Sequence, residues 1–291
     1  MVLEKRYYRL SDNSRKLFKR IRSYFDASGQ EVERHIYFSS RESDPALKII
    51  TSYAAFERPE RVRSFTRQNI LRSETFYLYD SSGRLVEKYF KNAKGIILAR
   101  HTWQLNEKGQ PVRYQKLGKN GQLILQKDFF YDERDNAVRE THSDALGQAL
   151  IIKKRLFDSK GHEVLENIYN GEGKLLARKY TFYNSDYVPV EISWYNPQQR
   201  IQRLELFAFW EDGTKKQETI LDFFVNQSFF KSFNRQGQLM NQQHRIGGQP
   251  VGEEIFEYDG QQFLTRRLKF VYKNGQRRPE EEIVFERIES S

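Results

Sequence analysis

The sequence predicts an all-β protein: an elongated antiparallel meander of about ten 26-residue, two-strand repeats in one strongly twisted or curled sheet. Two observations predict this fold. Valines recur at intervals of 26 residues, each preceded seven places earlier by a large apolar residue and then by Asp or Asn. Two turn positions alternate along the same stretch and mostly hold glycine. The valines are Val86, Val112, Val138, Val164 and Val190.

The two turn positions explain why the strands are expected to be antiparallel. The first holds Gly83, Gly109 and Gly161, and the second holds Gly95, Gly121, Gly147 and Gly173. In the segment 79–83, Asp80 can accept hydrogen bonds from backbone amides two residues on, and Gly83 can adopt the positive φ that ends the turn. The runs between turns favour β-formers, so consecutive hairpins are expected. Because open sheets rarely exceed about ten strands, some twenty strands should coil strongly or fold over.

The pattern divides a single domain, residues 1–291, into three parts. Residues 1–75 are basic and irregular, residues 76–205 repeat regularly, and residues 206–291 repeat less regularly. The first 22 residues are expected to form two strands, with a short helix over residues 17–21 as the alternative. A short helix is also considered for residues 221–230, where four phenylalanines crowd together.

Composition limits the functional classes. The chain has 291 residues, a net charge of +10, 39 Tyr and Phe residues together (17 and 22), and no cysteine. Without cysteine, disulfides and thiolate metal sites are impossible. No run of 18 apolar residues and no secretory leader are recognised, so we expect a cytoplasmic protein without a membrane span.

The charge and the expected open sheet suggest partners. A protein partner is expected first, and the net charge permits an anionic polymer or nucleic acid. An open sheet also has unpaired edges through which copies of the chain could associate.

The segment 79–85, Tyr-Asp-Ser-Ser-Gly-Arg-Leu, resembles the core of the YD repeats found in RHS-like β-hairpin proteins. The segments 157–161 and 131–132 are weaker instances. A second resemblance, carried by residues 103–123 and 181–193, is to the extended β-sheet domain of Gram-positive surface-protein and teichoic-acid glycosyltransferases. The second resemblance implies a module that helps to bind an acceptor protein or mediates oligomerisation, without the nucleotide-sugar half.

No motif for catalysis is present. The five histidines lack metal-ligand spacing, and Asp80, Asp132 and Asp158 recur in turns, where backbone capping explains them. We therefore expect no enzyme activity and assign no catalytic, cofactor-binding or metal-binding residue. The candidate binding residues are the basic N-terminal cluster and the three tryptophans, whose rings suit stacking on a partner: Arg15, Lys16, Lys19, Arg20, Arg22, Trp103, Trp194 and Trp210.

The sequence therefore favours a non-enzymatic protein-binding or scaffold module that uses a broad β-sheet surface or adds a strand at an unpaired edge. An accessory or acceptor-binding component of a cell-surface glycosyltransferase system is the first alternative. Nucleic-acid binding is the second.

Overall fold

A computed structural model describes residues 1–11, 14–38, 43–54 and 57–288. The described residues form 22 β-strands and no α-helix, which confirms the all-β prediction. None of these residues belongs to a helix long and apolar enough to cross a membrane. The strands are β1 (Val2–Ser11), β2 (Ser14–Phe25), β3 (Glu31–Tyr37), β4 (Leu47–Ala54), β5 (Arg58–Thr66), β6 (Leu71–Tyr79), β7 (Leu85–Asn92), β8 (Ile97–Leu105), β9 (Pro111–Leu117), β10 (Leu123–Tyr131), β11 (Ala137–Ser143), β12 (Ala149–Phe157), β13 (Glu163–Asn170), β14 (Leu175–Tyr183), β15 (Pro189–Tyr195), β16 (Ile201–Phe209), β17 (Lys215–Asp222), β18 (Gln227–Phe233), β19 (Leu239–Ile246), β20 (Gln249–Tyr258), β21 (Leu264–Lys273) and β22 (Gln276–Ile288).

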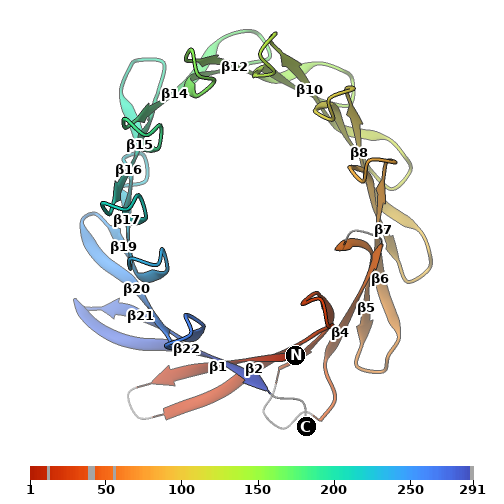
Figure 1. The fold of residues 1–291 in the computed structure, drawn as a ribbon, viewed down its shortest axis with the longest axis vertical. Helices are drawn as coiled ribbons and strands as arrows, with labels where there is room; N and C mark the ends of the chain where they lie inside the picture. Colours follow the sequence, from red (N-terminus) through yellow and green to blue (C-terminus); the bar gives the residue numbers. More distant parts are fainter. Residues whose placement is uncertain (12–13, 39–42, 55–56, 289–291) are drawn as a thin grey trace.

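The sheet closes on itself. Each strand pairs antiparallel with its neighbours in the chain, and β1 pairs with both β2 and β22, with Arg6 opposite Val284 and Tyr7 opposite Ile283. Viewed down the shortest axis, the 22 strands form a ring in which the first and last strands lie side by side (Figure 1). The predicted open meander of about ten repeats is therefore wrong. The expected self-association through sheet edges is wrong too, because no described strand keeps a free edge.

The strands are tilted relative to the ring. Thr102 of β8 lies opposite Gln115 of β9, which lies opposite Gln126 of β10. Residues aligned across two strands are therefore 24 apart in the chain, whereas equivalent positions of the repeat are 26 apart. Equivalent residues are therefore displaced along the strands by two residues, about 6.6 Å, for every two strands, about 9.6 Å. This stagger corresponds to a tilt of about 35°, in the range typical of closed barrels.

The turns follow the predicted chemistry. The Asp80 carboxylate accepts hydrogen bonds from the backbone N–H groups of Ser82 and Arg84, both at 2.9 Å, and Gly83 has φ +74°. Val86 of the valine series is the extra residue of a β-bulge, because Tyr79 lies opposite Leu85 while Leu78 lies opposite Glu87. A second bulge lies beside the alternate turn, because Phe90 lies opposite Ala99 while Lys91 lies opposite Ile97. The 26-residue repeat therefore encodes two turns, each with a bulge beside it.

The irregular regions are also strands. The first 22 residues lie in β1 and β2, as expected, although residues 12–13 of the connecting turn lie outside the described residues. Residues 40–75 include β4 and β5, with residues 40–42 and 55–56 outside the description. The helix considered for residues 221–230 is wrong. Asp222 ends β17, and its carboxylate caps a turn by accepting from the N–H groups of Phe224 and Val225.

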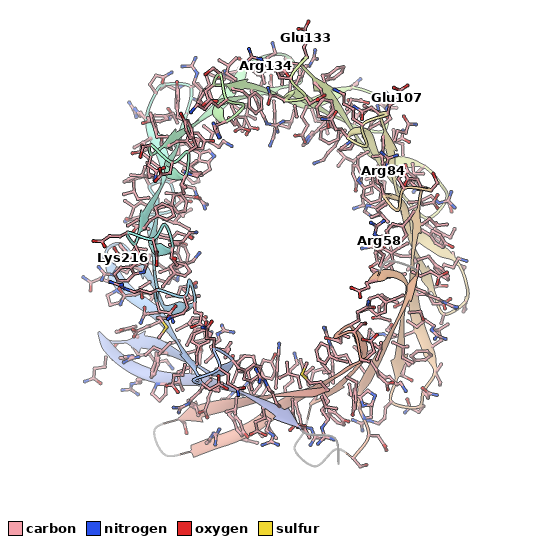
Figure 2. All side chains as sticks on the ribbon, viewed as in Figure 1. Arg58, Arg84, Glu107, Glu133, Arg134 and Lys216 are labelled. Atoms are coloured by element: carbon pink, nitrogen blue, oxygen red, sulfur yellow. The ribbon has the colours of Figure 1, made fainter. Side chains whose placement is uncertain are left out.

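The wall is a single sheet with little interior. Among the described residues, only Tyr37 and Ile283 are buried hydrophobic residues, each 4% exposed. Several buried residues are instead polar or charged, including Glu4, Glu140 and Glu166. The described side chains leave the central opening of the ring unfilled (Figure 2). Cohesion therefore comes from strand pairing, cross-strand contacts and ion pairs rather than from a central core.

Closure also corrects the expectations of no membrane span and a cytoplasmic location. The first rested on the absence of 18 consecutive apolar residues, and the second also on the absence of a recognised secretory leader. A closed antiparallel barrel of 22 strands has no unpaired edge, and barrels of this kind can cross bilayers with short strands of alternating side chains. The absence of a long apolar run is therefore the wrong criterion for this fold, and neither expectation stands.

Candidate binding surfaces

The basic N-terminal cluster lies at the seam where the barrel closes, and acidic residues compensate much of it. Glu4, which is fully buried, accepts a hydrogen bond from Arg6 Nε at 2.6 Å and pairs with Arg22. Arg15 pairs with Glu282 of β22. Burial raises the pKa of Glu4, but its hydrogen bonds to Arg22 and Arg6 outweigh that effect and lower the pKa below its ordinary value.

Three cations of the cluster also lie over aromatic rings of β1 and β3. Arg15 lies 3.8 Å from the ring centroid of Tyr8 and Lys19 5.0 Å from that of Tyr7. Arg20 lies 4.2 Å from the ring centroid of Tyr37, and Lys16 is exposed on β2. The structure therefore places these five residues on one strand, β2, from which Arg15 contacts β22. Lys19 and Arg22 contact β1, and Arg20 contacts β3.

The three tryptophans lie on different strands and do not form one site. Trp103 packs against Tyr114, with ring centroids 5.3 Å apart, and Tyr114 Oη lies 2.6 Å from His101 Nδ1. Burial lowers the pKa of His101, and the nearby cations Lys116 and Lys88 lower it further. Trp194 lies beneath the guanidinium of Arg203, 5.3 Å from its ring centroid. Cross-strand packing accounts for these two rings.

Trp210 is different because it replaces a turn-capping residue. It occupies the position held by Asp80, Asn106, Asp132, Asp158 and Asn184 in the preceding repeats. The backbone turn is retained, since Gly213 N–H still bonds to the Trp210 carbonyl at 3.0 Å. The indole cannot accept the two amide hydrogen bonds that the Asp or Asn oxygen accepts elsewhere. This repeat therefore lacks a local stabilising element that its neighbours have.

A cavity of about 300 Å³ lies beside Trp210, lined by Phe209, Trp210, Glu211, Asp212, Lys216 and Arg235. Lys216 Nζ lies 4.6 Å from the indole and the Arg235 guanidinium 5.3 Å from it. Neither cation forms an ion pair with any described residue. Figure 2 shows Lys216 on the outer margin of the ring. Sequence reasoning selected Trp210 as a candidate but missed Lys216 and Arg235. Only the pairing of strands β16 to β19 brings these two cations close to the indole.

A second break in the turn pattern lies one repeat earlier. Tyr187 stands where other repeats have glycine and adopts φ +59°, which is unusual for a bulky side chain. Its ring stacks on His162, with centroids 4.8 Å apart, and Lys160 Nζ lies 3.7 Å from its centroid. Stacking with the preceding turn offsets the backbone strain.

Exposed apolar side chains recur in register on one face of the wall. They form two rows near opposite rims, separated by polar residues such as Arg100, Thr102 and Lys154. The first row, called the Leu98 row, comprises Leu98, Ile124, Leu150 and Leu176, whose side chains are between 41% and 48% exposed. The second, called the Phe130 row, comprises Leu78, Phe130, Leu156 and Phe182. Sequence reasoning missed both rows, although their 26-residue spacing was visible.

The main ion-pair network lies within the wall. Arg155 of β12 bonds through Nη2 to Glu140 of β11 and through Nε to Glu166 of β13, each at 2.7 Å. Burial raises the pKa of Glu140, but hydrogen bonds from Arg155 and His142 outweigh it and lower the pKa to about 2. Each carboxylate is held by a cation, so the network joins three strands. The described residues contain no cluster of three or more His, Cys, Asp or Glu residues suited to a metal ion.

No protein-family model and no curated protein matches the chain. Among solved structures, it is similar to a TcdB2–TccC3 toxin complex (11% identity, 94% of this chain, 18% of that chain, TM-score 0.31). It is also similar to a Tc holotoxin pore from Photorhabdus luminescens (10% identity, 96% of this chain, 18% of that chain, TM-score 0.33). A third is a porin-like protein from Bacteroides uniformis (8% identity, 98% of this chain, 95% of that chain, TM-score 0.35).

These similarities are distant. The chain spans about a fifth of the toxin chains, and TM-scores of this size carry no conclusion about what the protein does. Tc toxins contain RHS/YD repeats, so the YD-repeat resemblance stands as a weak likeness of β-repeat architecture and no more. The resemblance to glycosyltransferase β-sheet domains finds no support in these comparisons.

Proposed function

We propose that the protein is a non-enzymatic protein-binding scaffold that docks its partner on the wall of the barrel through the exposed apolar rows. One observation carries the proposal: apolar side chains at equivalent repeat positions remain exposed, in register, across β8 to β14. Scattered exposed leucines are ordinary on protein surfaces, but these residues repeat at one position on every second strand, and exposed apolar groups bordered by polar residues are typical of an interaction site.

The size and composition of this surface suit a protein partner. A stable interface usually buries about 800 Å² on each partner, and a surface across seven strands is about 30 Å wide. Burial of the four Leu98-row side chains would supply the hydrophobic contribution. The polar belt containing Arg100, Thr102 and Lys154 would contribute hydrogen bonds and specificity.

The closed barrel narrows the binding modes. Strand addition at an edge is excluded among the described strands, because each has two neighbours. Much of the basic N-terminal cluster pairs with Glu4 and Glu282, which weakens the case for nucleic-acid binding there. Docking on the wall remains as the mode that the geometry supports.

The test begins with capture of partners from the native host and continues with titration of the purified partner. The variant Leu98→Ser/Ile124→Ser/Leu150→Ser/Leu176→Ser should weaken the complex at least tenfold, equivalent to about 1.4 kcal/mol. The control Ile70→Ser/Leu146→Ser removes exposed apolar residues outside the rows and should change affinity less than about twofold.

Two results would contradict the proposal. One is an unchanged affinity of the row variant for every captured protein. The other is a row variant that loses binding to phospholipid vesicles while its protein affinities stay the same, since the rows would then contact lipid rather than a protein.

A further inference from the structure

The Trp210 cavity is rich in hydrogen-bond donors that lack acceptors. Lys216 and Arg235 form no ion pair with any described residue, and the indole Nε1 is shielded from solvent without a hydrogen-bond partner. The buried indole donor without a partner is costly for the protein alone, whereas both cations are exposed to solvent. An anionic oxygen entering the cavity would give the two cations an acceptor.

The two acidic residues of the cavity do not provide that acceptor. The Asp212 carboxylate accepts a hydrogen bond from Thr214 N–H at 2.9 Å, which commits it to the turn. Glu211 is exposed and pairs with neither cation. The cavity therefore contains two acidic side chains and two exposed cations that form no ion pair with a described residue, although the charge of Arg235 helps to lower the pKa of Asp212.

Trp210 breaks a capping pattern that the preceding repeats keep. Five preceding repeats place Asp or Asn there, and each of those side chains accepts backbone amide hydrogen bonds. Local choices that conflict with the rest of a fold tend to mark functional sites. An aromatic ring between a lysine and an arginine keeps the two cations near each other at the rim.

We propose that this cavity binds a carboxylate of an acidic side chain on the protein partner, with Lys216 and Arg235 as ion-pair donors and Trp210 as the aromatic wall. The net charge of +10 favours approach of an acidic segment. Arginine offers two parallel N–H donors to a carboxylate, and lysine adds a compact charge. This inference rests on the proposed protein-binding function and names one contact within it.

Tryptophan fluorescence can report on this site alone. The protein has three tryptophans, so the variant Trp103→Phe/Trp194→Phe keeps Trp210 as the single reporter. This variant is titrated with a capped pentaglutamate peptide and, separately, with a capped pentaglutamine peptide. We expect a saturable signal change with pentaglutamate at a concentration at least tenfold lower than with pentaglutamine. Added salt should weaken this binding.

Two variants that remove the same charge test whether peptide binding depends on this site or only on the net charge of the protein. In the reporter background, Lys216→Gln/Arg235→Gln should raise the half-saturating pentaglutamate concentration at least tenfold. Lys94→Gln/Lys174→Gln removes the same charge from two exposed turns elsewhere and should change it less than twofold. Circular dichroism of both variants checks that the barrel is intact.

Three outcomes would overturn the inference. They are equal responses to the two peptides, equal weakening by the two charge variants, and saturation by inorganic phosphate or a uronate oligosaccharide at a lower concentration than by pentaglutamate. Failure of the proposed protein-binding function can be distinguished from failure of this inference. It would appear as an unchanged partner affinity in the Leu98-row variant, whatever the Trp210 fluorescence shows.

Discussion

Tyr131 Oη, at the end of β10, donates a hydrogen bond of 2.8 Å to the carbonyl oxygen of Pro111, which begins the neighbouring strand β9. Equivalent hydrogen bonds, each to a carbonyl oxygen 20 residues earlier in the chain, join Tyr79 to Pro59 and Tyr183 to Glu163. Each tyrosine therefore bonds to the last strand of the preceding hairpin and ties one hairpin to the one before it. This contact explains why an aromatic residue with a hydroxyl recurs at this position.

Removal of this hydroxyl tests the contact. Tyr131→Phe should lower the free energy of unfolding by about 1 kcal/mol, because the Pro111 carbonyl loses its side-chain partner. Urea denaturation followed by circular dichroism measures the change. Tyr77→Phe, whose hydroxyl has no hydrogen bond to a described residue, should have a smaller effect, and equal losses would contradict the assigned role.

Closure of the barrel can be tested with an engineered disulfide. Leu3 of β1 lies directly opposite Arg287 of β22. Directly opposed residues in antiparallel strands have Cα atoms about 4.5 or 5.5 Å apart, within the range that a disulfide spans. Leu3→Cys/Arg287→Cys, in a chain without cysteine, should form an intramolecular disulfide on mild oxidation, detected by non-reducing electrophoresis and mass spectrometry.

The disulfide experiment has a clear control. Leu3→Cys/Arg139→Cys places the second cysteine on β11, far around the ring, and should give only free thiols or intermolecular dimers. Similar intramolecular yields from both pairs at low protein concentration would show that the terminal strands are not held together.

The ion pairs of Glu4 should stabilise the closed form. Glu4→Gln leaves Arg6 and Arg22 without their buried carboxylate, and we expect a loss of about 2 kcal/mol in unfolding free energy, less than for a fully buried pair because both arginines reach solvent. An opened seam would expose the edges of β1 and β22, so dimers or larger species should also appear in light scattering. Glu286→Gln removes a more exposed partner of Arg6 and should cost less. A fully stable, monomeric Glu4→Gln protein would contradict this role.

Stability should also fall in acid through Glu140. Its pKa is lowered from 4.5 to about 2 in the folded protein, because the hydrogen bonds from Arg155 and His142 outweigh burial. A lowered folded-state pKa contributes stability above the unfolded value, which is lost as the pH falls from about 4.5 through about 2. The contribution at neutral pH is at most about 3 kcal/mol.

Urea unfolding at pH 7, 4 and 3 measures this dependence. Wild type should lose more stability over that interval than Glu140→Gln, which has no carboxylate to protonate. Parallel pH profiles for the two proteins would show that Glu140 does not titrate with the assigned shift.

Several local features could be predicted from the sequence because they depend on residues close together in the chain. The Asp80 cap and the positive φ of Gly83 lie within one five-residue turn, and the all-β prediction follows from the alternation between such turns. Trp210 could be selected as a candidate because an indole ring suits stacking on a partner wherever it lies in the chain. Its companions Lys216 and Arg235 could not, because their approach to the indole depends on strand pairing and on the rotamers of long side chains.

The sequence by itself determined the strands, the turns and the repeat. Only the tertiary structure decided that the sheet closes, because closure depends on how a small tilt and rotation per repeat accumulate over 22 strands. A slightly different stagger would leave β1 and β22 apart as free edges. Their basic and acidic residues, Arg6 and Glu286 among them, are complementary only when strands about 280 residues apart become neighbours. That long-range pairing turned a predicted open surface into a ring.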